Sequence, residues 1–214
     1  IRTTVLSFLA SILGALSVSA FAQGQLRPVR VRAVDALGRV AELSGQRRER
    51  ILIVLFTGSG ARETTAALSD RLDLVLIADR SIETWIVADV TSYDNFITRP
   101  FAEAEMRRQM RDGLAERRMR RTDRGAAGID HWRLIGDFEG SLMRAFGFRE
   151  VDRQPIAFVV DADSRARGPF VGASAHGAIL AAVEAARPTL APRVGGVPSL
   201  PRPSGQGASE GGSR

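Results

Sequence analysis

The residues best placed to do chemistry lie in a short turn, residues 58–62 (GSGAR), between an apolar run and a helix-like segment. Backbone N–H groups at a helix start, the helix dipole and the arginine could together hold an anion. The turn lacks the lysine of a phosphate-binding P-loop and the third glycine of a dinucleotide fingerprint. A tight structural turn is therefore the simpler interpretation, and anion binding is the alternative.

A serine, two histidines and nearby carboxylates also allow a catalytic site to be written from the sequence. A Ser59–His176–Asp161 triad would supply a nucleophile, a base and an orienting acid, but no spacing favours it. Ser59 is not in a G-x-S-x-G elbow, because Thr57 stands where the first glycine belongs. His131 and His176 are isolated and form no metal-binding pattern. An enzyme that uses the turn for non-thiol chemistry, such as hydrolysis, stays an alternative.

Cysteine and lysine are absent from the chain, and each absence removes a class of chemistry. Without cysteine there can be no disulfide, thiol nucleophile, zinc–thiolate site or iron–sulfur ligation. Without lysine there can be no Schiff-base catalysis. The net charge of +6 comes from arginine and favours acidic partners or anionic surfaces. We expect no cofactor and no bound metal.

The elements that must position the turn follow an alternating order. Apolar and basic residues alternate over residues 29–42 and predict a β-hairpin around Gly38. A continuous apolar run over residues 51–56 predicts a strand covered on both faces. The other predicted elements are strands at 84–90, 132–135, 154–161 and 168–171, and helices at 98–122, 141–146 and 175–186. This order predicts an α/β fold with a central mixed sheet.

The helix that follows the turn is predicted to begin at Ala61 and to bury one face, made of Leu68, Leu72, Val75 and Leu76. Residues 72–78 could instead form a strand. A continued helix is preferred, because residues 84–90 are a better strand and follow directly. In the later short helix, Ser141 is expected to be the N-terminal cap.

Residues 134–172, LIGDFEGSLMRAFGFREVDRQPIAFVVDADSRARGPFVG, resemble the C-terminal half of redoxin-type thioredoxin-like proteins. In that family an aspartate, a short helix, a loop and a proline-led strand, P-x-x-F-x-x-D, precede a β-hairpin and a glycine. Residues 51–56 resemble the strand that leads to the family's active-site turn. The stretch TWIVADVT resembles uncharacterised periplasmic thioredoxin-like proteins of the YtfJ type. The resemblance covers residues 29–186 and implies a thioredoxin-like α/β fold, with helices flanking a mixed sheet and an N-terminal hairpin.

The chain departs from this family at the active-site turn. The family's redox cysteines would fall near Ala61 and Thr64, and neither residue can form a thiolate, so disulfide exchange and peroxidase chemistry are excluded. Pro155 matches the family's cis-proline, which lies beside the turn and helps to hold an extended partner. A proline that only starts an edge strand is the alternative. The resemblance implies a partner-binding surface made of Ser59, Gly60, Ala61, Arg62, Thr64, Gln154 and Pro155.

Residues 103–124 predict an arginine-rich helix. One side has a narrow apolar stripe of Met106, Met110 and Leu114. Elsewhere arginines alternate with acids, with favourable i, i+4 pairs at Glu103–Arg107 and Glu116–Arg120. A solvated helix face is expected. Docking of the 107–124 segment (Arg107 to Arg124) to an acidic partner or an anionic membrane is the alternative, and no nucleic-acid partner is expected.

The two ends indicate an exported protein of one domain. Residues 1–22 combine Arg2, an apolar run and the small-residue site Ala20-Phe21-Ala22, which predicts a signal peptide cleaved after Ala22. No later segment is expected to span a membrane. Residues 187–214 are rich in proline, glycine and serine and predict a disordered tail, which leaves residues 23–186 as the thioredoxin-like domain.

We therefore expect a periplasmic or secreted, redox-inactive protein that acts as a protein- or peptide-binding module. Two alternatives stay open. One is the non-thiol enzyme described above. The other is an adaptor that attaches to anionic lipid or a polyanion through its arginine-rich helix.

Overall fold

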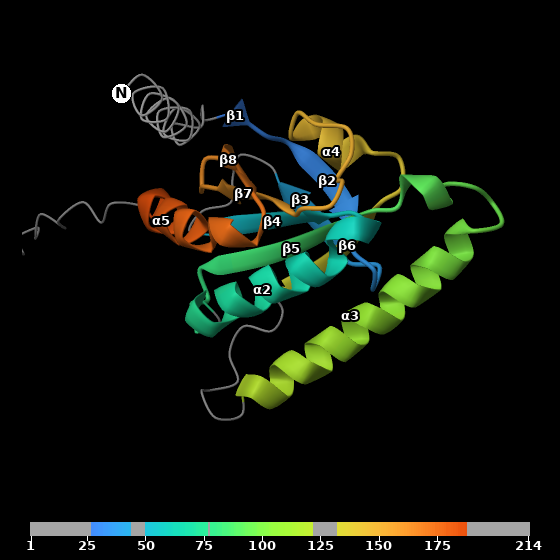
Figure 1. The fold of residues 1–214 in the computed structure, drawn as a ribbon, viewed down its shortest axis with the longest axis horizontal. Coiled ribbons are helices and arrows are strands. Elements are labelled where there is room, and N and C mark those ends of the chain that lie inside the picture. Colours follow the sequence, from blue (N-terminus) through green and yellow to red (C-terminus); the bar gives the residue numbers. More distant parts are fainter. Residues whose placement is uncertain (1–26, 44–49, 77, 122–131, 188–214) are drawn as a thin grey trace, which may run out of the picture.

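The computed structural model describes residues 27–43, 50–76, 78–121 and 132–187. The predicted signal peptide, most of the predicted tail and His131 lie outside these residues. Six strands form one sheet in the order β1-β8-β7-β4-β5-β6, and β2 and β3 form a separate hairpin (Figure 1).

The strands are β1 (Arg27–Pro28), β2 (Val31–Val34), β3 (Val40–Leu43), β4 (Ile51–Thr57), β5 (Ile82–Asp89), β6 (Trp132–Asp137), β7 (Ile156–Val160) and β8 (Arg165–Val171). The helices are α2 (Arg62–Leu76), α3 (Arg99–Arg121), α4 (Ser141–Ala145) and α5 (His176–Ala186). Short 3-10 turns are η1 (Ser59–Ala61), η2 (Thr91–Tyr93) and η4 (Ala173–Ala175).

The large sheet is mixed, as the sequence predicts. Strands β4, β5 and β6 are parallel, and β7 pairs antiparallel with both β4 and β8. Helices α2 and α5 cover one face, while the β2–β3 hairpin and α4 cover the other (Figure 1). Helix α3 packs on the same face as α2, on the side of β6. Ile86 of β5 shows this, since it packs against the core residues under α2 and α5 and also against those under α3. The α/β architecture expected from the sequence, a mixed sheet flanked by helices with an N-terminal hairpin, is confirmed.

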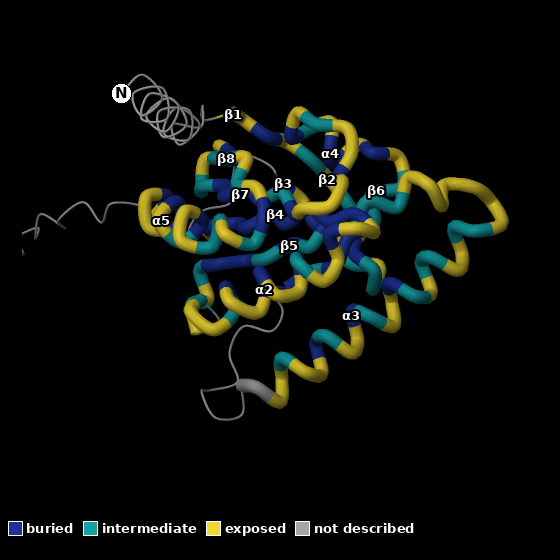
Figure 2. Tube along the Cα trace, in the orientation of Figure 1, coloured by how far each residue is buried: buried dark blue, intermediate teal, exposed yellow. Residues whose placement is uncertain are grey.

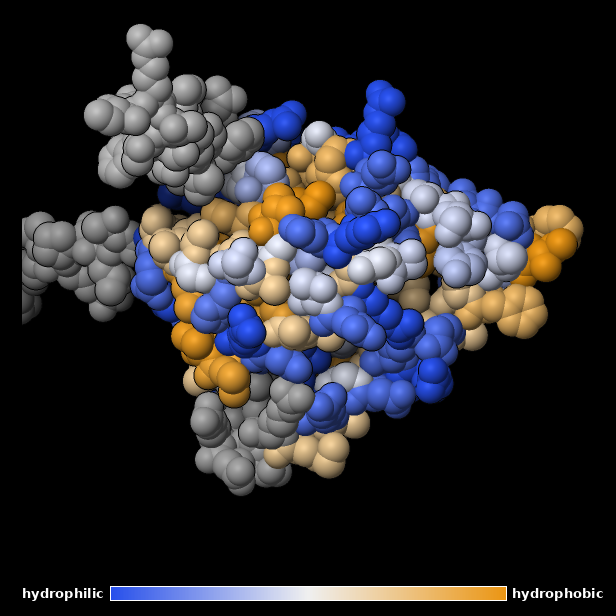
Figure 3. Space-filling model, in the orientation of Figure 1, coloured by the Kyte–Doolittle hydropathy of each residue, from blue (hydrophilic) through white to orange (hydrophobic). Residues whose placement is uncertain are grey.

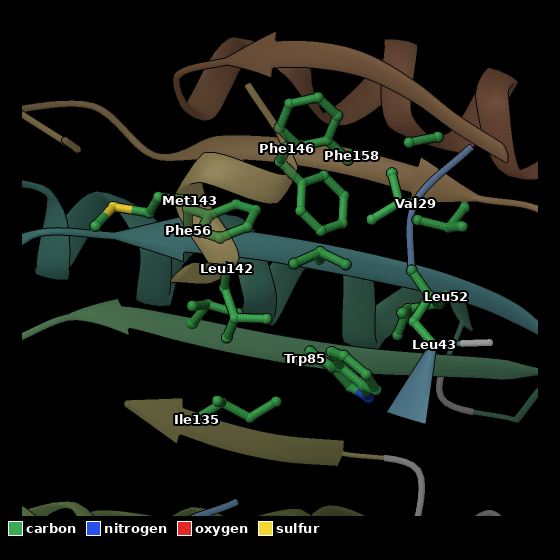
Figure 4. Packing of buried hydrophobic residues seen from close by; sticks show 14 of the residues in the cluster. Val29, Leu43, Leu52, Phe56, Trp85, Ile135, Leu142, Met143, Phe146 and Phe158 are labelled. Carbon is green, nitrogen blue, oxygen red and sulfur yellow. The ribbon is translucent and has the colours of Figure 1, made fainter. Parts of the chain in front are cut away.

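Every residue of β4 is buried, as its unbroken apolar run predicts. On one face Phe56 lies edge-on to Phe146, with ring centroids 5.1 Å apart (Figure 4). Phe56 also lies edge-on to Phe148, at 4.7 Å. The opposite face packs β4 against α2 and α5. The tube in Figure 2 is accordingly dark along the central strands and light along the outer sides of the helices. The end of β4, where the candidate site lies, is thus held on both faces.

A buried ionic network joins the hairpin to the sheet. Arg133 of β6 donates through Nε to Oε1 of Glu83 at 2.9 Å and through Nη1 to Oδ2 of Asp35 at 3.2 Å. Arg39 donates to the same Asp35 oxygen at 2.7 Å. Both carboxylates are almost fully buried, so their charges are compensated where water cannot reach them.

Two local predictions are wrong. Val75 is exposed, whereas Leu68 and Leu72 are buried as expected, because the helix turns Val75 away from the sheet. Ser141 is not the cap of α4, because Gly140, with φ 66°, occupies that position. Asp137 satisfies the helix start instead, since its Oδ2 accepts a hydrogen bond from the Met143 N–H at 2.9 Å. The preferred continuation of α2 is confirmed as far as Leu76.

Candidate functional site

The turn after β4 is shaped by Gly58. A Cβ at this position would lie 2.1 Å from the carbonyl oxygen of Val151, so only glycine fits without movement of that backbone. The chain then makes the single turn η1 and enters α2 at Arg62. Thr65 fixes this entry, because its hydroxyl donates to the Ala61 carbonyl at 2.8 Å and contacts the Thr57 hydroxyl at 2.9 Å.

The segment before β7 lies directly against this turn. A Cβ on Gly60 would lie 3.5 Å from the Asp152 carbonyl oxygen and 3.6 Å from the Cα of Arg153. Two residues later, the Pro155 carbonyl accepts a hydrogen bond from the Gly172 N–H at 2.9 Å. The structure therefore brings together the two sequence segments that the resemblance placed side by side.

The seven predicted surface residues differ in accessibility. Ser59, Gly60, Arg62 and Gln154 are exposed, Thr64 is half-buried, and Ala61 and Pro155 are buried. The cis interpretation of Pro155 is wrong: within the described residues a cis peptide bond precedes Pro169, and none precedes Pro155. At the positions expected for the family's cysteines, the chain has a buried alanine and a half-buried threonine, so this turn offers no thiol.

A cavity of about 650 Å³ opens beside the turn, between α2 and α3. We call it the α2–α3 groove. Its floor comes from β5 and β6 and includes Ile86, Trp132 and Leu134. Ser59 and Arg62 line the end nearest the turn. The groove also includes the carboxyl end of β5, which is the edge where parallel α/β sheets commonly bind ligands.

Charged side chains surround the largely apolar groove. The acidic ones are Asp70, Asp89, Glu105 and Glu116, and the basic ones are Arg62 and Arg117. Hydrogen bonds from Arg108 and Gln109 lower the pKa of Glu105 to about 2, and the charge of Arg62 adds to this shift. Glu105 is therefore ionised throughout the neutral range. The balance of charge along the groove is negative on a chain whose net charge is +6.

Arg117 fixes the distance between the two helices that form the groove. Its guanidinium lies 2.7 Å from the Asp73 carboxylate of α2 and donates to the Ser69 hydroxyl at 3.0 Å. The same group lies 4.2 Å above the Trp132 ring. The guanidinium is paired with a carboxylate and also lies over an indole ring, so these contacts hold α3 in a fixed position against α2 and β6. This end of the groove is thus closed by a structural contact.

Helix α3 and the loop before it also contribute to this site, which the sequence did not predict. Tyr93, Phe101 and Gln109 all line the groove. One signal was present, because Phe101 lies off the Met106–Met110–Leu114 stripe and so cannot point into the same core. That stripe itself is confirmed, since all three residues are buried against β6.

The register of the sheet rules out the Ser59–His176–Asp161 triad. Ser59 follows the end of β4, whereas Asp161 follows Val160, which pairs with Leu52 near the start of β4. The strand between Leu52 and Thr57 alone separates them by about 16 Å. Asp161 instead holds the β7–β8 turn, where its Oδ1 accepts from the Arg165 N–H at 2.9 Å. The described residues contain no cluster of three or more His, Asp or Glu side chains suited to a metal.

Helix α3 is largely covered by ion pairs, as the sequence predicts. Glu103 and Arg107 form the expected i, i+4 pair at 3.9 Å, and Glu105 contacts Arg108 at 2.7 Å. The side chain of Arg120 is outside the described residues, so the predicted Glu116–Arg120 pair is untested.

Comparisons with known proteins find similarity only to solved structures, in the overall arrangement of helices and strands. No family model and no curated protein matches the chain. Among solved structures, the chain is similar to an exposed lipoprotein thioredoxin, Etrx1, of Streptococcus pneumoniae, with 13% identity, a TM-score of 0.49, and 73% of this chain and 98% of the other covered. It is also similar to peroxiredoxin Q of Xanthomonas campestris, with 15% identity, a TM-score of 0.46, and 76% and 98% covered. The activities of those proteins do not extend to a chain without cysteine.

Proposed function

We propose that this protein is an exported, redox-inactive binding domain that holds a peptide segment of a partner protein. The observation that carries the proposal is the largely apolar α2–α3 groove of about 650 Å³, next to the turn where the cysteines are missing. Its volume lies within the range that is typical of ligand-binding pockets in proteins. Ser59 and Arg62, two of the residues expected from the sequence, are among the residues that line it.

The lining defines the chemistry of the segment that would fit. An apolar side chain would displace water from the floor formed by Ile86, Trp132 and Leu134. The carboxylates along the groove favour a positive charge next to that anchor. The ligand we propose is therefore an extended segment with an aromatic or branched aliphatic residue beside an arginine or lysine.

The exposed residues around the neighbouring turn would extend this site. Gly60 and Gln154 are exposed, and their backbone and amide groups can bond a peptide main chain. Ala61 and Pro155 are buried, so in this proposal they shape the surface without touching the partner.

A displayed library of random peptides, selected against the protein, tests this proposal. The dissociation constant of a selected peptide is then measured by fluorescence anisotropy for the wild type and two variants. Ala66→Trp fills the groove from α2, and Ala181→Trp adds the same side chain to the exposed side of α5 as a control. We expect Ala66→Trp to weaken binding by about tenfold or more, because it occupies the anchor position.

The control variant should bind like the wild type. Equal affinity of Ala66→Trp and Ala181→Trp would overturn the proposal, as would a library that yields no peptide with an apolar residue next to a cation.

A further inference from the structure

The loop that leads into α3 exposes an unusual amount of apolar surface. Tyr93, Phe96, Ile97 and Phe101 are 48%, 89%, 59% and 75% exposed. The three aromatic residues among them are the only large exposed aromatics in the described part of the chain. Figure 3 shows this apolar surface at the end of the molecule where the loop protrudes. We call these four residues the apolar tip.

The tip is held in place by its own hydrogen bonds. The Asn95 side-chain oxygen accepts from the Thr98 N–H at 2.9 Å, and the Thr98 hydroxyl donates to the Tyr93 carbonyl at 3.0 Å. Arg99 closes the loop through Asp94 at 3.1 Å. The backbone is thus built to point Phe96 and Ile97 outward, although apolar side chains gain nothing from contact with water.

The outer side of α3 continues from the tip as one stripe. Residues spaced by three and four along the helix share a face. Six such residues of α3 are all exposed: Phe101, Ala104, Arg108, Arg111, Ala115 and Arg118. Ile97, two residues before the helix, is exposed too. The stripe contains no acidic residue. Glu103, Glu105, Asp112 and Glu116 lie beside it, and Glu105 pairs with Arg108 at 2.7 Å.

We infer that this outer surface, the apolar tip with the arginines of α3, docks on a membrane whose headgroups are anionic. The side chains of Phe96, Ile97 and Phe101 would enter the interfacial layer, and Arg111 and Arg118 would contact lipid phosphates. No helix among the described residues is long and apolar enough to cross a bilayer, so the protein would lie on the surface.

The shape of this surface favours a lipid layer over a protein groove. Phe96 and Ile97 protrude from a convex end of the molecule, and neither lines the cavity beside the tip. On this one face, the apolar residues of the tip are followed by arginines of α3. This order matches the change from acyl chains to phosphates across a membrane interface. Tyr93 and Phe101 of the tip also line the α2–α3 groove, whereas Phe96 and Ile97 do not, so the inference is tested at these two residues independently of what the groove binds.

Co-sedimentation with vesicles tests the inference. The protein begins at Gln23, its expected mature start, because the apolar run of residues 1–22 could itself bind lipid. Vesicles of phosphatidylcholine alone are compared with vesicles that also contain phosphatidylglycerol. We expect binding to the anionic vesicles, reduced about tenfold or more in a Phe96→Ser/Ile97→Ser variant, because each side chain loses its transfer from water.

Matched variants separate this effect from a general loss of apolar or basic surface. Val34→Ser/Val40→Ser removes two other exposed apolar side chains, from the hairpin, and should bind like the wild type. Arg111→Gln/Arg118→Gln should weaken binding and its dependence on salt more than Arg71→Gln/Arg80→Gln, which changes two exposed arginines elsewhere.

Three results would overturn the inference. The first is no sedimentation with anionic vesicles. The second is an equal loss of binding in the hairpin variant. The third is a tip variant that sediments normally but loses affinity for a protein, which would make the tip a protein-docking surface instead.

Discussion

Replacement of Gly58 by alanine is the sharpest test of how the candidate site is built. Gly58 has φ −102° and ψ −179°, an extended conformation open to any residue. Alanine therefore costs nothing in backbone torsion. Its Cβ would, however, lie 2.1 Å from the Val151 carbonyl oxygen, so the turn and the 151–155 segment must move apart by roughly 1 Å to reach an ordinary contact.

The magnitude follows from the rigidity of both partners. Val151 is buried and its carbonyl belongs to the backbone, so the clash cannot be relieved by a side-chain rotation. Overpacking of this kind typically costs about 1–3 kcal/mol, and we expect about 2 kcal/mol for Gly58→Ala. For a domain of this size that corresponds to a fall in Tm of about 4–8 °C.

Urea unfolding of three alanine variants provides the measurement and its controls. A Cβ on Gly60 would make only ordinary contacts, the nearest at 3.5 Å, so Gly60→Ala should change stability little. Gly177 in α5 has nothing within 4 Å, so Gly177→Ala should stabilise the protein by about 0.5–1 kcal/mol. A Gly58→Ala variant that unfolds at the same urea concentration as Gly60→Ala would refute the tight packing of the turn against Val151.

Three further predictions concern charges. Arg117→Met should lower the free energy of unfolding by about 2 kcal/mol, because it removes the ion pair with Asp73 and the hydrogen bond to Ser69; an unchanged urea midpoint would contradict this. Arg133→Met should cost about 3 kcal/mol, since it removes the arginine shared by the two buried carboxylates and leaves each of them with less compensating charge; a stability equal to that of the wild type would contradict it. The lowered pKa of Glu105 means that its contribution is complete above its ordinary value of 4.5 and is lost as the pH falls toward about 2. The stability difference between wild type and Glu105→Gln should therefore shrink below pH 4.5, and a difference that grows on acidification would contradict the sign.

The architecture was predictable because its signals are local. The unbroken apolar run of β4 can only be buried on both faces, and the alternation of the β2–β3 hairpin requires one wet face. The narrow stripe of α3 likewise specified which side packs on β6. The prediction failed where more than one nearby side chain could satisfy the N–H groups at a helix start. Ser141 was expected to cap α4, but Asp137 of the preceding strand accepts the hydrogen bond instead.

The groove could not be predicted, because it depends on how two helices cross. Helices α2 and α3 are separated in sequence by β5, and their spacing is set by the contact of Arg117 with Asp73 and Trp132. No pattern in the sequence pairs these residues. Which residues of the predicted site are buried could not be predicted from the sequence either, since Ala61 is buried as a member of a core cluster that forms only in the folded chain.

The most direct test of the central claim is NMR mapping of a selected peptide on the protein. The backbone amide signals of the described residues are followed as the peptide is added. The proposed function predicts shifts confined to the Ser59–Arg62 turn, the inner side of α2 up to Asp70, and the groove side of α3 from Phe101 to Arg117. Shifts that leave these residues unchanged and appear only in the β2–β3 hairpin or α5 would contradict a binding site in the α2–α3 groove.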